Sequence, residues 1–314
     1  MTARDIINEI AAVRGRRLLD STTGELSIRL YALEASLRAL GASKNETIRY
    51  FPVAIVACME GMVRAAIKDM IDAGSPYTER AERLASKLRL DYSLIAALQG
   101  KRVTVGEFVA HGVPISRLEH IDGAVSELMG SSFLEGLRTV ADRWAHGSNK
   151  APLLTEPDRI FSDVRRTIEL RHIVCHELAT AYVFDNEEIE RCFDSCVRFL
   201  RAADELIFQT VYPDAPLTQP DLNEAAGAQL SADEAQLAEV IESIAARLDA
   251  EARADFEGIQ TAWRGYRDAW VHFVVGEREN GGTIWPLLYL SEMSAITRRR
   301  TSELEAYNAS WNNV

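Results

Sequence analysis

Three side chains able to bind phosphate and move protons lie within six consecutive residues, Arg171-His172-Ile173-Val174-Cys175-His176. In a helix, His172 and His176 are four residues apart and therefore share one face, about one turn from each other. Arg171 and His176 are five apart, about 140° around the same axis. The long arginine side chain or a helix distortion has to close that gap, so the spacing allows a shared pocket without requiring one.

Cleavage of RNA without a metal needs this combination of groups. A base must activate the ribose 2′-hydroxyl, a donor must protonate the leaving 5′-oxygen, and positive charge must face the phosphorane. Histidine, with an ordinary pKa of about 6.5, can serve as base or acid near neutral pH. Arginine stays charged and offers two parallel N–H groups to phosphate oxygens. DNA lacks the 2′-hydroxyl, so the predicted chemistry is specific for RNA and leaves a 2′,3′-cyclic phosphate and a 5′-hydroxyl.

The run fits R-[N/H/D]-x-x-x-H, the signature of the HEPN superfamily, and residues 25–212 resemble a HEPN domain. The resemblance rests on the motif, on its place in the penultimate helix of the first domain, and on the apolar helix that follows. By this resemblance Arg171 and His176 match the invariant pair, and His172 matches the variable polar position. It implies a metal-independent endoribonuclease that needs no cofactor and works as a homodimer, with the motifs of both protomers in one cleft.

The resemblance also implies a biological setting. HEPN nucleases often act as toxins or antiphage effectors, so we expect an RNA substrate and a protein antitoxin or regulatory partner. Members paired with nucleotidyltransferase antitoxins often carry a tyrosine two residues after the motif histidine, where this chain has Leu178. The departure puts neutralisation by modification in doubt, but not cleavage. Glu177 and Glu60 are candidate supporting carboxylates, although a salt-bridged surface glutamate is the simpler interpretation of Glu60.

Two alternatives stay open at this point. In the first, the HEPN fold serves only for dimerisation, and a C-terminal domain recruits a partner without catalysis. In the second, His172 and His176 on one helix and Cys192 and Cys196 on the next, each pair four residues apart, form a zinc site. Against zinc, both cysteines lie on the apolar side of their helix, where free cysteine behaves as a small hydrophobe.

Composition bounds these hypotheses. The 314 residues are enough for one large or two ordinary domains, with 47% hydrophobic and 26% charged residues. The net charge of −12 opposes broad, nonspecific nucleic-acid binding but allows a small basic cleft. No run approaches the roughly 18 to 20 apolar residues of a membrane span, and the acidic N-terminal segment does not resemble a signal peptide. We therefore expect a cytoplasmic protein without membrane contact, whose four cysteines are free, buried thiols.

Helical periodicity runs through nearly the whole chain, and no alternating strand pattern is convincing. The sequence therefore predicts an all-α fold, a HEPN-type helical bundle followed by a small helical domain. We expect a first domain over residues 1–212, with an insertion around 75–130, then a proline-containing linker over 213–230 and a second domain over 231–314. The predicted helices span about 24–40, 45–74, 131–145, 158–184, 187–211, 231–248, 251–275 and 287–307.

A second resemblance covers residues 240–307. A tryptophan and Tyr-Arg-Asp cluster at 260–269, the Gly281-Gly282 turn and the Thr-Arg-Arg-Arg-Thr-Ser-Glu-Leu end at 297–304 look like the lysozyme-inhibitor LprI-like helical domain. Secreted members usually carry cysteines that this segment lacks, which suits a reducing compartment. We interpret the segment as an interaction or regulatory module. Aromatic residues recur along its predicted second helix at helical intervals, and we expect them to pack in the core.

Overall fold

The computed structural model describes residues 3–19, 21–40, 46–86, 88, 92–100, 103–145, 150–177 and 181–310. Within these residues the chain is all-α, as predicted, and the one β-type pairing is an isolated bridge between Ala141 and Pro152. The chain divides into two compact units, Met1–Pro213 and Asp214–Val314.

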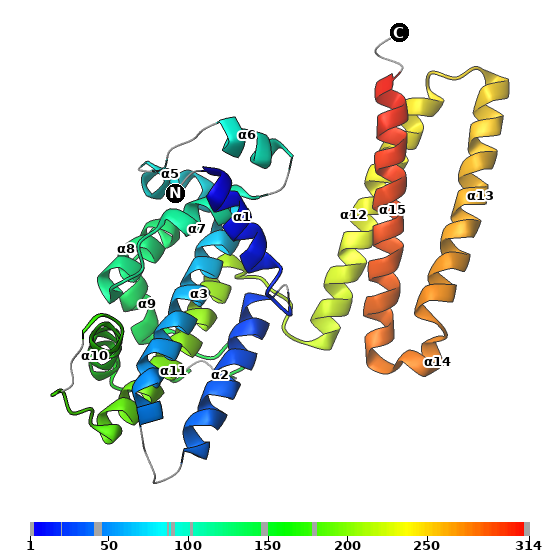
Figure 1. Cartoon of the computed structure of the whole chain (residues 1–314). Helices are drawn as coiled ribbons and strands as arrows, with labels where there is room; N and C mark the ends of the chain where they lie inside the picture. Colours follow the sequence, from blue (N-terminus) through cyan, green and yellow to red (C-terminus); the bar gives the residue numbers. More distant parts are fainter. Residues whose placement is uncertain are drawn as a thin grey trace. The chain divides into compact units, whose positions relative to one another are not determined.

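Unit 1 is a bundle of long helices with several short ones (Figure 1). Its elements are α1 (Ala3–Arg14), α2 (Thr22–Ala39), the 3₁₀ helix η1 (Glu46–Tyr50), α3 (Phe51–Asp72), α4 (Tyr77–Arg80), α5 (Glu82–Ala85), α6 (Tyr92–Gln99), α7 (Val105–Gly112), α8 (Leu118–Met129), α9 (Phe133–Thr139), α10 (Pro157–His176) and α11 (Asn186–Val211).

Helix α3 forms the centre of unit 1, where it packs against α2, α7, α8, α10 and α11. Pro52 occupies its first turn, where a missing amide donor costs little, and Gly74 follows its end with a positive φ of 93°. The stretch Glu46–Asp72 is long and apolar enough to cross a membrane, but more than half of its most apolar window is buried inside the bundle. A buried core helix explains this composition without a membrane.

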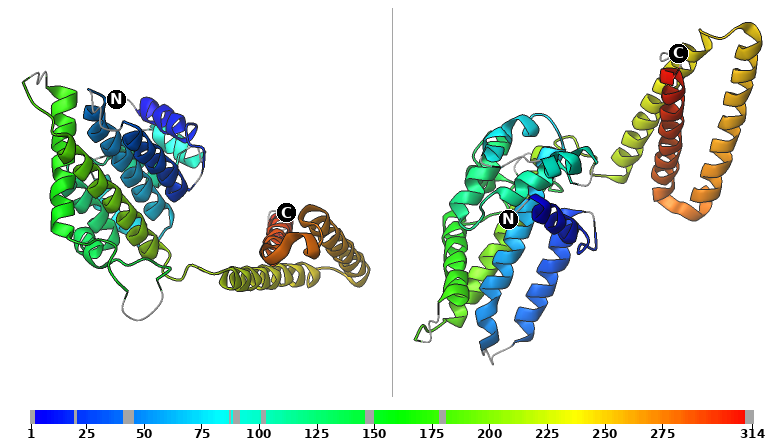
Figure 2. Two further views of the ribbon diagram at one scale, coloured as in Figure 1. Left: turned by 90° about the horizontal axis from the view of Figure 1, so that it is seen from below. Right: turned by 45° about the horizontal axis from the view of Figure 1, so that its top comes forward.

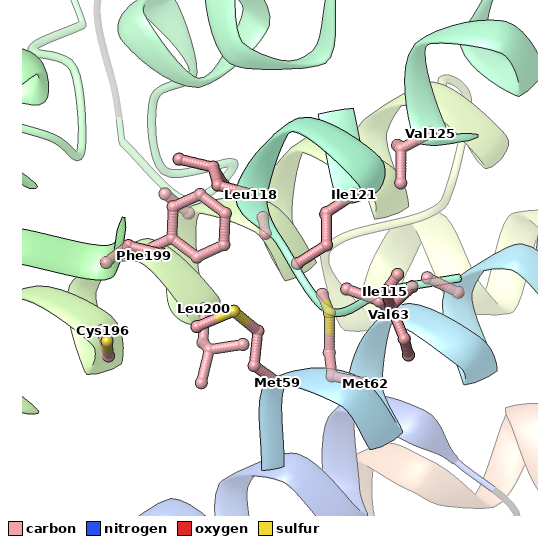
Figure 3. Close-up of a cluster of buried hydrophobic side chains, with 14 of the residues drawn as sticks. Met59, Met62, Val63, Ile115, Leu118, Ile121, Val125, Cys196, Phe199 and Leu200 are labelled. Carbon is pink, nitrogen blue, oxygen red and sulfur yellow. The ribbon is translucent and has the colours of Figure 1, made fainter. Parts of the chain in front are cut away.

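The core lies where α3, α8 and α11 meet (Figure 3). Met59 and Met62 of α3 point toward Leu118 and Ile121 of α8, with Phe199 of α11 alongside, and all five side chains are buried. Phe199 also meets the ring of Phe133 edge-on at 6.1 Å between centroids. Side chains from helices far apart in the sequence therefore share one continuous apolar cluster.

The segment predicted as an insertion is part of this core. Helix α8 buries Leu118, Ile121, Val125 and Leu128, and α7 packs closely along α3. The helices of this segment, around residues 75–130, are short. Each therefore has too few turns to show a helical period in the sequence, and their boundaries could not be predicted. Thr104 caps α7 through its side chain, and Val105 and Gly106 begin the helix.

Helix α10 ends earlier than predicted. Its last residue is His176, and Glu177 has extended backbone angles, whereas we expected the helix to continue to Phe184. Two causes are visible in the sequence that follows. Tyr182, Val183 and Phe184 are aromatic or β-branched residues with modest helix propensity, and Asp185 caps the next helix through its side chain. The motif therefore lies at a helix terminus.

Unit 2 contains three long helices, α12 (Gln219–Ala245), α13 (Ala250–Val275) and α15 (Trp285–Ser310), with the short α14 (Arg278–Gly281) and η2 (Gly282–Ile284) before the last (Figure 2). Helix α15 packs against both α12 and α13. Helix α12 begins at Gln219, not at Ser231 as predicted, because Thr218 and Asp221 form a capping box there. Most of the expected linker 213–230 is thus helical.

Of the four aromatic residues that we expected in the core, only Trp263 packs against the apolar clusters of unit 2. Trp263 is half-buried, but the side chains of Tyr266, Trp270 and Phe273 are 59%, 39% and 79% exposed. Their rings form a ladder, with centroids 6.2 Å apart for the first pair and 6.0 Å for the second. The buried side of α13 instead holds Gln260, Arg267 and Val271, so its aromatic side is a surface.

Candidate functional site

The motif side chains point outward from the last turns of α10. Leu170 is fully buried and Ile173 nearly so, and these two residues anchor the helix end against the bundle. The positions between the two anchors face away from the core, so His172 is exposed and Arg171 is half-exposed. His176 lies three positions after Ile173, but it is the last residue of α10 and is exposed as well.

Arginine and histidine meet despite their unfavourable spacing. The Nη1 of Arg171 lies 3.2 Å from the Nε2 of His176. Arginine can only donate, so this hydrogen bond requires a neutral imidazole with an unprotonated Nε2. The ring of His172 lies 4.9 Å from that of His176, centroid to centroid, with the planes tilted by 45°. One guanidinium and two imidazoles therefore form a compact group, which the sequence permitted but did not require.

The group lies on open surface at a helix end. The peptide N–H of Glu177 caps α10 by donating to the carbonyl of Ile173, and the Glu177 side chain is exposed. Cavities of the described residues lie between other helices, for example α1, α3 and α7, or α1, α2 and α3. A substrate as large as RNA, or a second protomer, could approach the motif without displacing protein.

Glu60, the other supporting carboxylate we predicted, is placed elsewhere. It lines a cavity formed by α1, α2 and α3, with Arg29 of α2 and Arg64 of α3 beside it, and no residue of α10 lines that cavity. On α3, Glu60 precedes Arg64 by one turn, whereas the side that meets α10 and α11 carries apolar residues such as Met59. The structure therefore does not bring Glu60 to the motif histidines.

The four residues of the zinc alternative are also not assembled. Cys192 and Cys196 are fully buried, and the Sγ of Cys196 donates to Thr167 at 3.3 Å, whereas both histidines face solvent. Burial raises the pKa of Cys196 to about 12, which keeps it a neutral thiol and a poor metal ligand. Within the described residues, no group of three or more histidine, cysteine or acidic side chains could hold a metal ion.

Cys175, which we expected to be buried with the other cysteines, is exposed beside His176. Cys58 is half-buried, and its pKa is raised by burial although Arg29 lies close enough to oppose the shift. The apolar period of α10 explains the difference, because Cys175 lies two positions after the anchoring Ile173 and on the opposite side of the helix.

A support that the sequence did not reveal lies one turn before Leu170. Arg166 donates from Nη2 to the hydroxyl of Tyr182 at 2.5 Å and from Nε to Glu188 at 2.8 Å. These bonds tie the segment after the motif, and the start of α11, back to α10. The hydrogen bond to Glu188, followed by that to Glu169, raises the pKa of the Arg166 guanidinium. No sequence pattern marks this triad, since its members belong to three different segments.

Comparison with known families bears on the C-terminal part. Residues 213–304 match the family described as Lysozyme inhibitor LprI. The match confirms the LprI-like domain predicted for residues 240–307 and extends it toward the N-terminus, over the whole of α12. No curated protein and no solved structure matches the chain.

Proposed function

We propose that unit 1 is a metal-independent endoribonuclease of HEPN type, with Arg171, His172 and His176 at its active site. The contact of 3.2 Å between Arg171 and His176 carries the proposal, because it joins a phosphate-binding group to a proton-transfer group on accessible surface. The short distance between the histidine rings adds a second imidazole to the same group.

In the proposed reaction, an RNA phosphate draws the guanidinium of Arg171 away from His176 and exposes the Nε2 lone pair. His176 then takes the proton of the ribose 2′-hydroxyl, the 2′-oxygen bonds to phosphorus, and the bond to the 5′-oxygen breaks. A protonated imidazole, His172 or a histidine of a second protomer, returns a proton to the leaving oxygen. The products are a 2′,3′-cyclic phosphate and a 5′-hydroxyl, and no metal or redox partner is needed.

The proposed active form is a homodimer. A single exposed motif supplies one arginine, whereas two apposed motifs supply two arginines and four histidines and enclose the phosphate away from water. This concentration of cationic groups offsets the net charge of −12, which would otherwise repel RNA. We further propose, from the resemblance to HEPN effectors, a toxin or antiphage role restrained by a protein partner.

The test is cleavage of a mixed RNA pool by purified full-length protein in EDTA, followed by mapping of the product ends. We expect His176→Ala and Arg171→Ala to lower the rate by on the order of 100-fold or more, since each removes a group that acts in the transition state. Arg165→Ala is the matched control, because Arg165 lies on the same helix and only pairs with Glu119 at the surface.

Two further arms sharpen this test. RNA whose 2′-hydroxyls are methylated should remain intact, because the nucleophile is blocked. Cleavage that persists in both His176→Ala and Arg171→Ala would exclude the proposed site. Absence of cleavage by the wild type, with and without candidate activators, would favour the alternative below.

The alternative function is partner recruitment without catalysis. The observation that favours it is the exposed ladder of Tyr266, Trp270 and Phe273 on α13, since aromatic side chains are enriched at the centres of protein interfaces. A lysozyme is the first partner to test, because residues 213–304 match a family of that description. Calorimetric titration of a lysozyme into the wild type and into Trp270→Ser tests this function. Saturable binding to the wild type that the variant loses supports recruitment. No heat of binding with the wild type rejects this partner.

A further inference from the structure

Unit 1 contains two adjoining cavities between its first helices, of about 410 Å³ and 500 Å³. Helices α1 and α3 line both, and α2 and α7 complete their walls. The two cavities share Val13, Arg17, Arg64 and Ala65, so the guanidiniums of Arg17 and Arg64 stand between them. We propose that this double cavity binds a small organic phosphate through Arg17, Arg29 and Arg64, with its apolar body against α1 to α3.

The cationic side chains of the double cavity fall into two classes. Arg14 forms a bidentate ion pair with Glu107 at 2.7 Å, and Lys68 pairs with Asp69 and Asp72.

The second class has no such partners. The side chains of Arg17, Arg29 and Arg64 form no hydrogen bond or ion pair with any described residue. In a chain of net charge −12, three arginines around one cavity with no acidic partner among the described residues need an explanation.

The nearby carboxylates of Glu25 and Glu60 do not neutralise the three arginines. Glu25 and Glu60 line the same cavity, but neither forms an ion pair with the three arginines. One oxygen of Glu25 is already used, since it accepts the peptide N–H groups of Leu18 and Leu19 at 2.6 Å each. Together the walls carry five cationic and three anionic side chains, and Asp69 and Asp72 pair with the wall residue Lys68. The excess positive charge therefore lies with Arg17, Arg29 and Arg64.

Arg64 gives the sharpest indication. Its Nε is buried and has no hydrogen-bond partner. A buried donor without an acceptor destabilises the folded state, so such groups in native proteins are usually satisfied by something the chain does not itself provide. Other atoms of Arg64 border both cavities, so a turn of its side chain would bring the Nε to an oxygen of an anion lodged between them.

The walls also indicate what the anion is attached to. Ile10, Val13, Leu26, Ala57 and Met62 line the two cavities and offer an apolar surface. Cavities of this size hold small molecules, and guanidinium forks match the oxygens of phosphate. A phosphate presents three acceptor oxygens and up to two charges, enough for several arginines, whereas a carboxylate would leave part of the cluster unpaired.

The test uses isothermal titration calorimetry on the full chain with two probes, adenosine 5′-monophosphate and dodecyl phosphate below its micellar concentration. The first represents soluble nucleotides and the second lipid-like phosphates, so the preferred probe identifies the source of the ligand. We expect saturable binding of at least one. Arg17→Met, Arg29→Met and Arg64→Met should each weaken it by on the order of 10-fold or more, with Arg64→Lys intermediate.

Controls separate this site from the proposed nuclease site. Arg83→Met removes an arginine that is 82% exposed and does not line the double cavity, and it should bind as wild type does. Arg171→Ala removes the phosphate-binding arginine of the proposed nuclease site, which does not line the double cavity, so it should leave the Arg64-dependent part of the binding in place. If Arg171→Ala abolishes binding while Arg64→Met does not, the phosphate binds at the motif and the cavity proposal fails.

The melting temperature of Arg64→Met distinguishes a ligand-binding role of Arg64 from a structural one. A structural role predicts that the substitution lowers the melting temperature. Since the Nε of Arg64 has no partner among the described residues, Arg64→Met should fold normally, with an unchanged or higher melting temperature. It should also lose the increase in melting temperature that the bound probe gives to wild type. No binding of either probe by wild type, or equal binding by wild type and Arg64→Met, would overturn the proposal.

Discussion

The two units bury different kinds of side chain. In unit 1 one large apolar cluster joins α2, α3, α8, α10 and α11, and a smaller one lies between α1, α6 and α7. In unit 2 the apolar clusters are small, and polar side chains fill much of the space between the three helices. The buried carboxylate of Asp233 accepts from Gln229 and Arg298 at 2.9 Å and 3.2 Å, and also from Ser294.

Arginines extend the same network in unit 2. Arg267, 9% exposed, donates to Glu234 at 3.0 Å and lies against the ring of Trp263. Arg300 donates to Gln260 at 3.2 Å and also lies against the ring of Trp263. Polar networks of this kind require one register of the helices, whereas apolar packing tolerates repacking. In unit 2, polar contacts thus fix the register of the helices, and the exposed rings of Tyr266, Trp270 and Phe273 stay accessible to a partner.

The largest expected effect tests the apolar side of the comparison. Phe199→Ala removes a fully buried ring that meets Phe133 and Phe161 edge-on. The lost burial and the remaining cavity should lower the free energy of unfolding by about 3 to 5 kcal/mol. Urea unfolding followed by circular dichroism should show this loss in the transition of unit 1. A separately expressed 214–314 segment serves as the reference, because its unfolding identifies the transition of unit 2. That transition should be the same in the Phe199→Ala protein and in the wild type.

A smaller effect tests the polar side. Asp233→Ala leaves Arg298, Ser294 and Gln229 without their shared acceptor and should cost about 1 to 3 kcal/mol in unit 2. Glu239→Ala, an exposed position on the same helix, is the control and should change stability by less than about 0.5 kcal/mol. If both variants unfold alike, the network is not what fixes the helices of unit 2.

The exposed aromatic ladder should contribute little to folding. The triple variant Tyr266→Ser, Trp270→Ser, Phe273→Ser removes surface rings, so each change should alter stability by no more than about 0.5 kcal/mol. Loss of an exposed apolar face should instead reduce self-association, which light scattering over a concentration series measures. A large fall in melting temperature would contradict the distinction between core and surface rings.

The smallest effect concerns pH. Asp204 of unit 1 accepts one hydrogen bond, from Thr23 at 3.0 Å, in contrast to the several donors around Asp233. Burial raises the pKa of Asp204, although the bond from Thr23 and the charge of Arg143 oppose the rise. The folded state therefore holds the proton to a higher pH than the unfolded chain, and stability should fall as pH rises from about 4 through the raised pKa.

Asp204→Asn should remove this dependence. At neutral pH the variant should be slightly more stable than wild type, because the penalty for a half-buried charge is gone, and near pH 3 the two should converge. Thermal unfolding at a series of pH values measures both. A variant less stable than wild type at pH 7 would show that the carboxylate charge is favourable there.

Several features followed from the sequence. Helical periodicity predicted the all-α class and, within a few residues, α2, α3, α11, α13 and α15. The aromatic and Gly-Gly pattern identified the LprI-like segment. Boundaries failed where local signals competed: α10 stops at His176 because an extended segment and a new cap follow, and α12 starts at Gln219 because Thr218 and Asp221 form a capping box there. In both cases a capping side chain decided the end of a periodic pattern.

The sequence by itself determined which groups with useful chemistry exist and which of them are neighbours along one helix. Arg171, His172 and His176 lie within two turns, so local geometry was enough to bring them into contact. Only the tertiary structure could separate buried Cys196 from those histidines, or gather Arg17, Arg29 and Arg64 around one cavity. Helix packing sets such distances, and they depend on side chains far apart in the chain that no local period records.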